Sequence, residues 1–136
     1  AGLLTVALSL AFANVTSVEA DANAVRAARR NLSAAPHVTV LEGDVRATLR
    51  SGLGDHGVGP DVVVLDPPRS GAGRDTVAAL VALNAPRLVY VACDPVALAR
   101  DTALLATHGY ALEHVEAWDL FPMTHHVESL ALFARG

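Results

Sequence analysis

Short apolar runs alternate along the chain with segments of helical periodicity, and this alternation restricts the fold more than any other feature. Runs rich in β-branched residues predict strands, whereas apolar residues that recur every three or four positions predict helices. Strands and helices in regular succession are typical of a parallel sheet with helices packed on it. The predicted strands are residues 15–18, 38–41, 61–65, 88–92, 110–117 and 127–133, and the predicted helices are residues 3–13, 22–32, 45–49, 74–83 and 95–108.

The last two predicted strands follow each other without a helix between them, so we expect them to pair antiparallel as a hairpin. The runs at 61–65 and 88–92 are unbroken apolar stretches, which is typical of strands buried on both faces of a parallel sheet. The fold predicted from the pattern is α/β, a doubly wound sheet that ends in an antiparallel hairpin.

The composition predicts one packed domain without a strong electrostatic grip on nucleic acid. Of the 136 residues 52% are hydrophobic and 18% are charged, which excludes a disordered chain because there is ample apolar surface to bury. The net charge is −4, and all 10 basic residues are arginines with no basic run among them. We therefore do not expect this segment to bind the phosphates of a nucleic acid irrespective of sequence.

The single cysteine and the apolar start of the chain bear on the compartment. Cys93 has no partner for an internal disulfide, which fits a reducing, cytoplasmic location. The apolar stretch at 2–15 has no basic flank and is shorter than the ~20 residues that span a bilayer. We therefore expect a buried helix there and no membrane partner.

Three acids and the thiol directly follow predicted strands. They are Glu19, Asp44, Asp66 and Cys93. Because the carboxyl ends of parallel strands meet at one edge, where open α/β sheets bind ligands, these side chains form a candidate site. Acidic residues also favour turns and helix caps, so each acid taken alone admits a purely structural role.

The acids near the start of the chain fit a nucleoside-type ligand. Glu19 is placed to accept hydrogen bonds from a ribose diol, and Gly2 lies in the turn region ahead of the first helix. Asp44, after Gly43, is placed to accept a hydrogen bond from an adenine amino group, or else only caps the next helix. The two prolines after Asp66 hold that carboxyl rigidly at the sheet edge.

Cys93 and the segment before the last strand leave several readings open. Cys93 is either a small buried apolar side chain or a nucleophile. A Cys-His hydrolase built from Cys93 and His125 or His126 is conceivable, although the sequence indicates no oxyanion hole for it. The paired histidines lack a third ligand at suitable spacing, so we expect no metal. Glu128 is either a surface residue or a carboxylate beside the thiol.

Three stretches together resemble the catalytic domain of the RNA 5-methyluridine methyltransferases. These class I S-adenosylmethionine enzymes methylate carbon 5 of a uridine in transfer or ribosomal RNA. The stretches match, in the family's order, its proline motif, its nucleophile motif and its closing motif: residues 65–69 with 71–72, residues 90–95 with 98–101, and residues 119–122 with 124–128.

The resemblance implies a Rossmann-like methyltransferase fold, S-adenosylmethionine as cofactor and an RNA substrate. It implies that Cys93 is the nucleophile and Glu128 the base, and that Glu19, Asp44 and Asp66 line the cofactor pocket. Thiolate addition at carbon 6 of uracil would activate carbon 5 for methylation, and Glu128 would then remove the carbon 5 proton. This chemistry requires no metal.

The resemblance also implies a first strand ahead of this chain, in the middle of the sheet. We therefore expect residues 1–136 to be a catalytic domain truncated at its N-terminus, inactive alone and with the main RNA-gripping surface elsewhere. The sequence does not indicate an oligomeric state.

Two other classes compete with this interpretation. A class I nitrogen methyltransferase with an acid-Pro-Pro-aromatic motif is disfavoured because Arg69 occupies the aromatic position. A non-catalytic remnant or interaction module is disfavoured because Cys93 and Glu128 both stand in their motif contexts.

Overall fold

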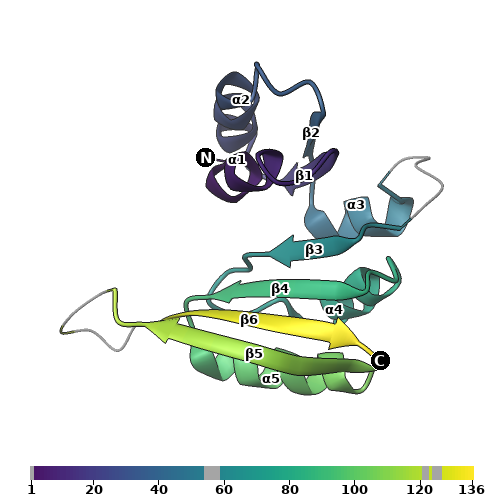
Figure 1. Ribbon diagram of the computed structural model, residues 1–136, viewed down its shortest axis with the longest axis vertical. Coiled ribbons are helices and arrows are strands. Elements are labelled where there is room, and N and C mark those ends of the chain that lie inside the picture. Colours follow the sequence, from purple (N-terminus) through teal and green to yellow (C-terminus); the bar gives the residue numbers. More distant parts are fainter. Residues whose placement is uncertain (1, 54–58, 121–122, 124–126) are drawn as a thin grey trace. The chain divides into compact units, whose positions relative to one another are not determined.

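The computed structural model describes residues 2–53, 59–120, 123 and 127–136. The chain divides into two compact units, Ala1–Asp55 (unit 1) and His56–Gly136 (unit 2), each with its own hydrophobic cluster. The helices are α1 (Leu3–Ser9), α2 (Ala22–Asn31), α3 (Val45–Ser51), α4 (Gly73–Val81) and α5 (Pro95–Ala106), and the strands are β1 (Val15–Glu19), β2 (Val38–Glu42), β3 (Val62–Leu65), β4 (Arg87–Ala92), β5 (Tyr110–Trp118) and β6 (Glu128–Arg135) (Figure 1).

Unit 1 is built on the parallel pair of β1 and β2, whose register runs from Val15↔Val38 to Glu19↔Glu42. Helix α2 contacts both strands. Its apolar residues recur on one face, as predicted, and Asp21 caps its start by accepting a hydrogen bond from the Ala24 N–H at 2.7 Å. The buried cluster consists of Val25, Ala28, Leu32 and Val40.

The prediction of a buried helix at the start of the chain is wrong. Helix α1 ends at Ser9, and its Leu3 is 83% exposed. The apolar side chains lie all around this short helix, whereas among the described residues it contacts chiefly β1. The buried side chain of α1 is the polar Thr5, which donates a hydrogen bond to Ser17 Oγ at 3.2 Å.

Unit 2 is built on a four-stranded sheet in the order β3-β4-β6-β5. β3 and β4 are parallel, whereas β6 is antiparallel to both β4 and β5. Helices α4 and α5 lie on one face of this sheet and contact each other (Figure 1). The core between sheet and helices includes Leu88, Tyr90, Leu105, Tyr110 and Phe133, each at most 2% exposed.

The predicted α/β class and the antiparallel C-terminal hairpin are confirmed. The pattern did not indicate that β6 lies between β4 and β5, where every second residue from Ser129 to Phe133 is buried. Ser129, Ala131 and Phe133 point into the core, which anchors β6 more firmly than the mostly exposed β5. β3 is half-buried along its whole length, so its prediction as a strand fully buried on both faces is wrong for the described residues.

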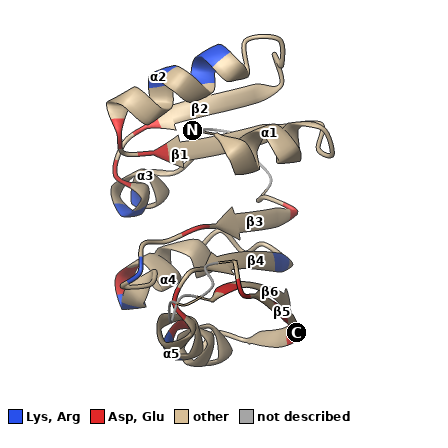
Figure 2. Ribbon diagram, turned by 90° about the vertical axis from the view of Figure 1, so that its left-hand side faces the viewer, with Lys and Arg blue, Asp and Glu red and all other residues tan. Residues whose placement is uncertain are grey.

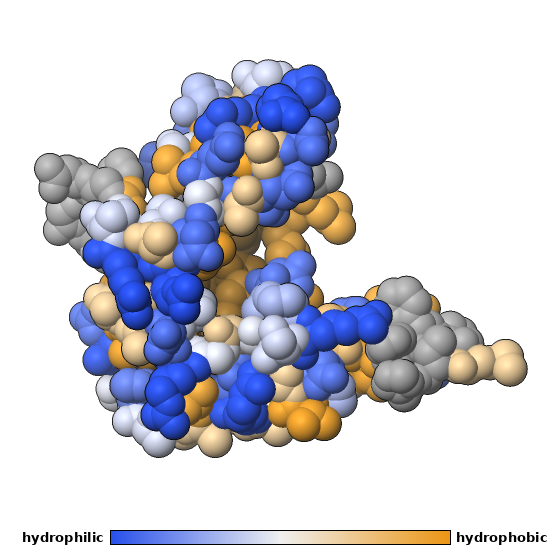
Figure 3. Space-filling view, turned by 180° about the vertical axis from the view of Figure 1, so that it is seen from behind, coloured by the Kyte–Doolittle hydropathy of each residue, from blue (hydrophilic) through white to orange (hydrophobic). Residues whose placement is uncertain are grey.

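Apolar residues also reach the surface outside α1. Figure 3 shows apolar residues interspersed with hydrophilic ones on one face of the molecule. In the described part of the chain, no helix has both the length and the apolarity needed to cross a membrane.

Two leucines in unit 2 test where the core lies. Leu88 is fully buried on β4, whereas Leu112 on β5 is 45% exposed. We expect Leu88→Ala to lower the free energy of unfolding by about 2 to 5 kcal/mol, because it leaves a cavity in the core. Leu112→Ala, the matched control, should cost about 1 kcal/mol or less. Urea unfolding followed by the fluorescence of the single tryptophan, Trp118, measures both, and equal losses would contradict this core assignment.

Candidate active site

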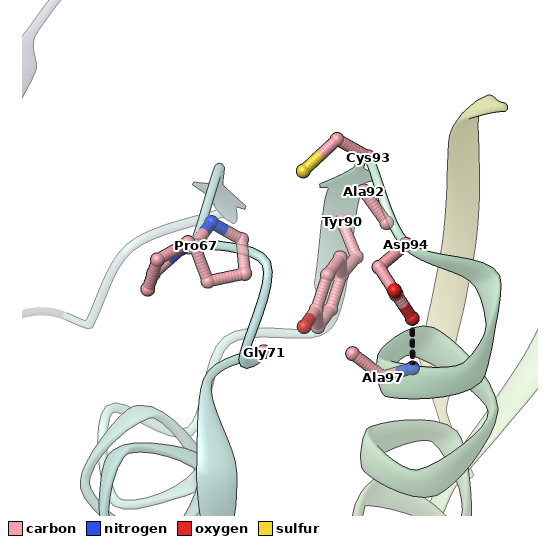
Figure 4. Close-up of a pocket in the computed structure, with 8 residues that line it drawn as sticks. Pro67, Gly71, Tyr90, Ala92, Cys93, Asp94 and Ala97 are labelled. Atoms are coloured by element: carbon pink, nitrogen blue, oxygen red, sulfur yellow. Dashed lines mark hydrogen bonds between the residues drawn. The ribbon is translucent and has the colours of Figure 1, made fainter. Parts of the chain in front are cut away.

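Cys93 lies one residue beyond the end of β4, beside a small cleft at the carboxyl edge of the unit 2 sheet. Asp94 caps α5 by accepting a hydrogen bond from the Ala97 N–H at 2.8 Å, with Pro95 in the first turn, as the sequence predicts. Cys93 is half-buried and lines the cleft. Its sulfur is directed toward the side where Pro67 lies (Figure 4). The thiol is therefore not sealed inside the core.

Glu128 begins β6 at the same end of the sheet. Ala92 pairs with Ser129 in the antiparallel register of β4 and β6. Cys93 follows Ala92 and Glu128 precedes Ser129, so both flank the last paired position of this ladder. Glu128 is half-buried and pairs with Trp118 on its other side. The register thus brings together two residues that are far apart in the sequence.

Asp66 and the two prolines follow β3, which runs parallel to β4. Leu65 pairs with Tyr90, so the segment after β3 leaves the sheet at the same edge as Cys93. Pro67 and Pro68 line the cleft, and Tyr90 lies between Pro67 and the Asp94–Ala97 side (Figure 4). Asp66 keeps contact with solvent, but partial burial raises the pKa of its carboxyl above 3.8.

Asp101 on α5 is a site residue whose role the sequence analysis missed. Its side chain is fully buried, and its Oδ2 accepts hydrogen bonds from the Tyr90 hydroxyl at 2.7 Å and from the Ala72 N–H at 2.6 Å. Burial and the hydrogen bond to Asp101 raise the pKa of the Tyr90 hydroxyl, which therefore stays a donor. The missed signal is the spacing, since Asp101 shares a helix face with Leu98 and Leu105.

Gly71 occupies the turn that brings the loop after β3 against α5. Its φ of 79° lies in the left-handed region, and its N–H donates to the Pro68 carbonyl at 2.7 Å. A Cβ at this position would come within 2.6 Å of Asp101 Oδ2. Only glycine fits here, because the backbone and the buried carboxylate approach so closely.

The two acids of unit 1 lie at the carboxyl edge of their own strand pair. Glu19 ends β1, and its carboxylate accepts a hydrogen bond from the Asp21 N–H at 2.9 Å. Its carbonyl accepts one from the Gly43 N–H at 3.0 Å, which holds the end of β1 beside the turn after β2. Asp44 caps α3 through the Ala47 N–H at 2.8 Å. Figure 2 shows acidic residues where β1 ends and where α2 and α3 begin.

Gly2 has a clear packing role. A Cβ at this residue would lie 3.1 Å from Ala28 Cβ, so Gly2 allows the start of α1 to approach α2 closely. Glu19, Asp44 and Gly2 thus belong to unit 1, whereas Asp66, Cys93 and Glu128 belong to unit 2. That Gly2, Glu19, Asp44 and Asp66 line one cofactor pocket stays a prediction, as do the catalytic roles of Cys93 and Glu128.

His125 and His126 lie outside the described residues, as do Phe121, Pro122 and Thr124 of the closing motif. The Cys-His and paired-histidine interpretations therefore stay untested. Among the residues that are described, no group of three His, Cys, Asp or Glu side chains is arranged to hold a metal ion.

The raised pKa of Asp66 predicts a pH-dependent effect of Asp66→Asn. The folded chain binds the Asp66 proton more readily than the unfolded chain, so this contribution to stability is present below pH 3.8 and is lost as the pH rises through the raised pKa. Asp66→Asn should therefore be more stable than the parent at neutral pH, and the advantage should shrink toward about pH 4.

Urea unfolding at several pH values measures this difference. Asp61→Asn, which removes an exposed carboxyl just before the same strand, is the charge-matched control. A stability difference between Asp66→Asn and the parent that does not change with pH would contradict the assignment.

Solved structures confirm the Rossmann-like methyltransferase fold. The chain is similar to a tRNA (uracil-54, C5)-methyltransferase of Pyrococcus abyssi solved with S-adenosyl-L-homocysteine, with a TM-score of 0.72 and 30% identity over 89% of this chain and 29% of that one. It is also similar to the N-methyltransferase NodS of Bradyrhizobium japonicum, with a TM-score of 0.75 and coverage of 99% and 80%. The identity to NodS is 15%, so that similarity shows the fold alone.

Curated relatives are described as uncharacterized RNA methyltransferases. One from Streptomyces avermitilis is 48% identical over 87% of this chain and 27% of the relative, and one from Thermotoga maritima is 37% identical over 99% and 30%. The chain spans less than a third of the length of these relatives. The family model described as tRNA (Uracil-5-)-methyltransferase matches residues 52–136, which contain the cleft, Cys93 and Glu128. The chain therefore belongs to the tRNA (uracil-5-)-methyltransferase family.

Proposed function

We propose that this chain carries the catalytic residues of an S-adenosylmethionine-dependent RNA methyltransferase that methylates carbon 5 of a uridine. The observation that carries the proposal is the position of Cys93 and Glu128. A half-buried thiol at a cleft and a half-buried carboxylate flank the same end of the β4–β6 ladder. A pyrimidine ring held above this end would meet a nucleophile and a base together.

The reaction needs both residue types. Carbon 5 of uracil is a weak nucleophile, so the Cys93 thiolate first bonds to carbon 6 and moves electron density onto carbon 5. After carbon 5 is methylated, Glu128 takes the proton from that carbon. The carbon 5–carbon 6 double bond then reforms as the bond to the Cys93 sulfur breaks, which restores the thiolate.

The donor set fits S-adenosylmethionine, which when bound supplies an electrophilic methyl group on its sulfonium sulfur. Glu19 would hold the ribose hydroxyls and Asp44 the adenine amino group, because carboxylates at the ends of parallel strands accept hydrogen bonds from such groups. Asp66 would border the reacting end. In unit 1 the Gly43 N–H donates a hydrogen bond to the backbone carbonyl of Glu19. This bond supports the proposed role of Glu19 and Asp44, since it holds the ends of β1 and β2 side by side.

The proposed substrate is RNA. The Pyrococcus abyssi relative is named for a transfer RNA uridine, and the curated relatives are described as RNA methyltransferases. The net charge of −4 offers phosphates little attraction. We infer that this chain handles the target base, while most phosphate contacts come from other parts of the intact protein.

RNA that carries 5-fluorouridine at the target position tests the nucleophile. Fluorine at carbon 5 cannot be removed as a proton, so the intact protein with S-adenosylmethionine should form a stable protein–RNA adduct on Cys93. Denaturing electrophoresis detects the adduct and peptide mass spectrometry locates it. Cys93→Ala should abolish it. An adduct at another residue, or undiminished methylation by Cys93→Ala, would overturn the proposal.

The role of Glu128 is tested with RNA that carries the natural uridine, again with the intact protein, S-adenosylmethionine and detection of the protein–RNA adduct. Glu128→Gln should still form the bond to Cys93 but fail to remove the carbon 5 proton, so methylated adduct should accumulate while product release slows. Glu113→Gln, an exposed change on β5, is the matched control. Product release at the parental rate by Glu128→Gln would remove this residue from the mechanism.

Cofactor binding has its own test. Glu19→Gln should weaken binding of S-adenosylmethionine about 10- to 100-fold, the effect of weakening hydrogen bonds to a charged acceptor. Calorimetric titration of the intact protein measures this change. Glu42→Gln, an exposed change opposite Glu19 in the β1–β2 register, is the control. Equal affinities of the Glu19→Gln variant and the parent would exclude Glu19 from the cofactor site.

A further inference from the structure

We propose that Asp101, together with Tyr90 and Arg100, is a positioning cluster that fixes the loop after β3 opposite Cys93. These three residues form the loop anchor. None of them needs to touch the substrate, because they act on the backbone of residues 70–73. The consequence for catalysis rests on the proposed function, whereas the consequence for access to Cys93 does not.

Asp101 holds the loop by direct bonds to its backbone. Its Oδ2 accepts from the Ala72 N–H at 2.6 Å and from the Gly73 N–H at 3.3 Å. The same oxygen accepts from the Tyr90 hydroxyl at 2.7 Å, which ties the loop to β4 as well as to α5. One fully buried carboxylate therefore joins three parts of unit 2.

Arg100 makes a second connection between α5 and the loop. Its Nη2 donates to the Ser70 carbonyl at 2.6 Å and to Asp101 Oδ1 at 3.1 Å, and its Nε donates to the same Oδ1 at 3.2 Å. The Arg100 side chain is 53% exposed, so it closes the anchor from the solvent side. The planar guanidinium suits this task, because its fixed donors set the loop and the carboxylate in one geometry.

Gly71 shows how tightly the loop is held. A Cβ there would contact Arg100 Nη2, Asp101 Oδ2 and Ala97 Cβ at once. Gly71 also lines the cleft with Pro67 and Pro68. The segment that forms one wall of the cleft is thus pressed directly against the anchor.

A buried charge is a costly way to connect helix and loop. Apolar side chains of similar volume often stabilise as well or better, whereas a hydrogen-bonded carboxylate fixes direction and distance. Here the carboxylate holds the loop that carries Pro67, Pro68 and Gly71, which line the cleft together with Tyr90 and Cys93. Tyr90 lies between Pro67 and the Asp94–Ala97 side (Figure 4). The geometry points to control of the space in front of the Cys93 sulfur.

Two variants loosen the anchor without removing its buried carboxylate. Tyr90→Phe keeps the ring in the cleft but removes the hydroxyl donor. Arg100→Ala removes the bonds to Ser70 and to Asp101 Oδ1. Arg87→Ala is the control, because it removes the same charge at the start of β4, at the end of the strand away from Cys93. Arg100→Ala decides the question alone if Tyr90→Phe fails to fold.

The first measurement is the alkylation rate of Cys93 by iodoacetamide in the intact protein, followed on the Cys93 peptide by mass spectrometry across pH. We expect both variants to react several-fold faster than the parent and Arg87→Ala, with the same midpoint of the pH profile. If the alkylation rate at high pH rises while the midpoint of the pH profile stays the same, the variant has changed access to the sulfur and not the acidity of the thiol. All rates are compared well below the melting temperature of each variant.

The second measurement is the single-turnover rate of adduct formation on 5-fluorouridine RNA. We expect a loss of about tenfold or more in both variants, with the RNA concentration that gives half of the maximal rate unchanged, because a small misplacement of reacting groups slows chemistry more than binding. Parental rates in both measurements would overturn the inference, as would losses that only follow a lowered melting temperature. If the parent itself forms no adduct while the variants alkylate faster, the proposed function fails and the positioning role stands.

Discussion

The registers of β4 determine where the candidate site of unit 2 lies. β4 pairs in parallel with β3 and antiparallel with β6, so the end of β3, the end of β4 and the start of β6 meet at one edge. This arrangement brings Asp66, Cys93 and Glu128 to the same edge. A shift of one residue in the β4–β6 register would exchange the two faces of β6 and bury Glu128.

The hydrogen bonds of Asp101 complete what the registers begin. Strand pairing fixes where the loop after β3 starts, but not the path it follows. The buried carboxylate defines that path through the Ala72 N–H and the Tyr90 hydroxyl. In the described part of the chain no buried side-chain nitrogen or oxygen lacks a partner, so this polar cluster inside an apolar core is fully satisfied.

Much of the fold could be predicted because strands and helices differ in apolar periodicity. The face of α2, the caps Asp21 and Asp94, and the C-terminal hairpin follow from local patterns. The exposure of α1 and the half-burial of β3 could not be predicted in the same way, because burial depends on which elements contact a segment. In the site, position after a strand indicated Asp66 and Cys93, whereas Asp101 stood unmarked within a helix.

The amino-acid sequence alone shows the residue types at each strand end, since a thiol, a carboxylate or a double proline is a property of the chain at that position. It also determined the family, because three motifs appear in one order. The insertion of β6 between β4 and β5, which brings Glu128 to Cys93, and the bond between Asp101 and Ala72 are visible only in the folded chain. Both are contacts between distant segments, and their geometry depends on strand register and helix packing, which no local pattern encodes.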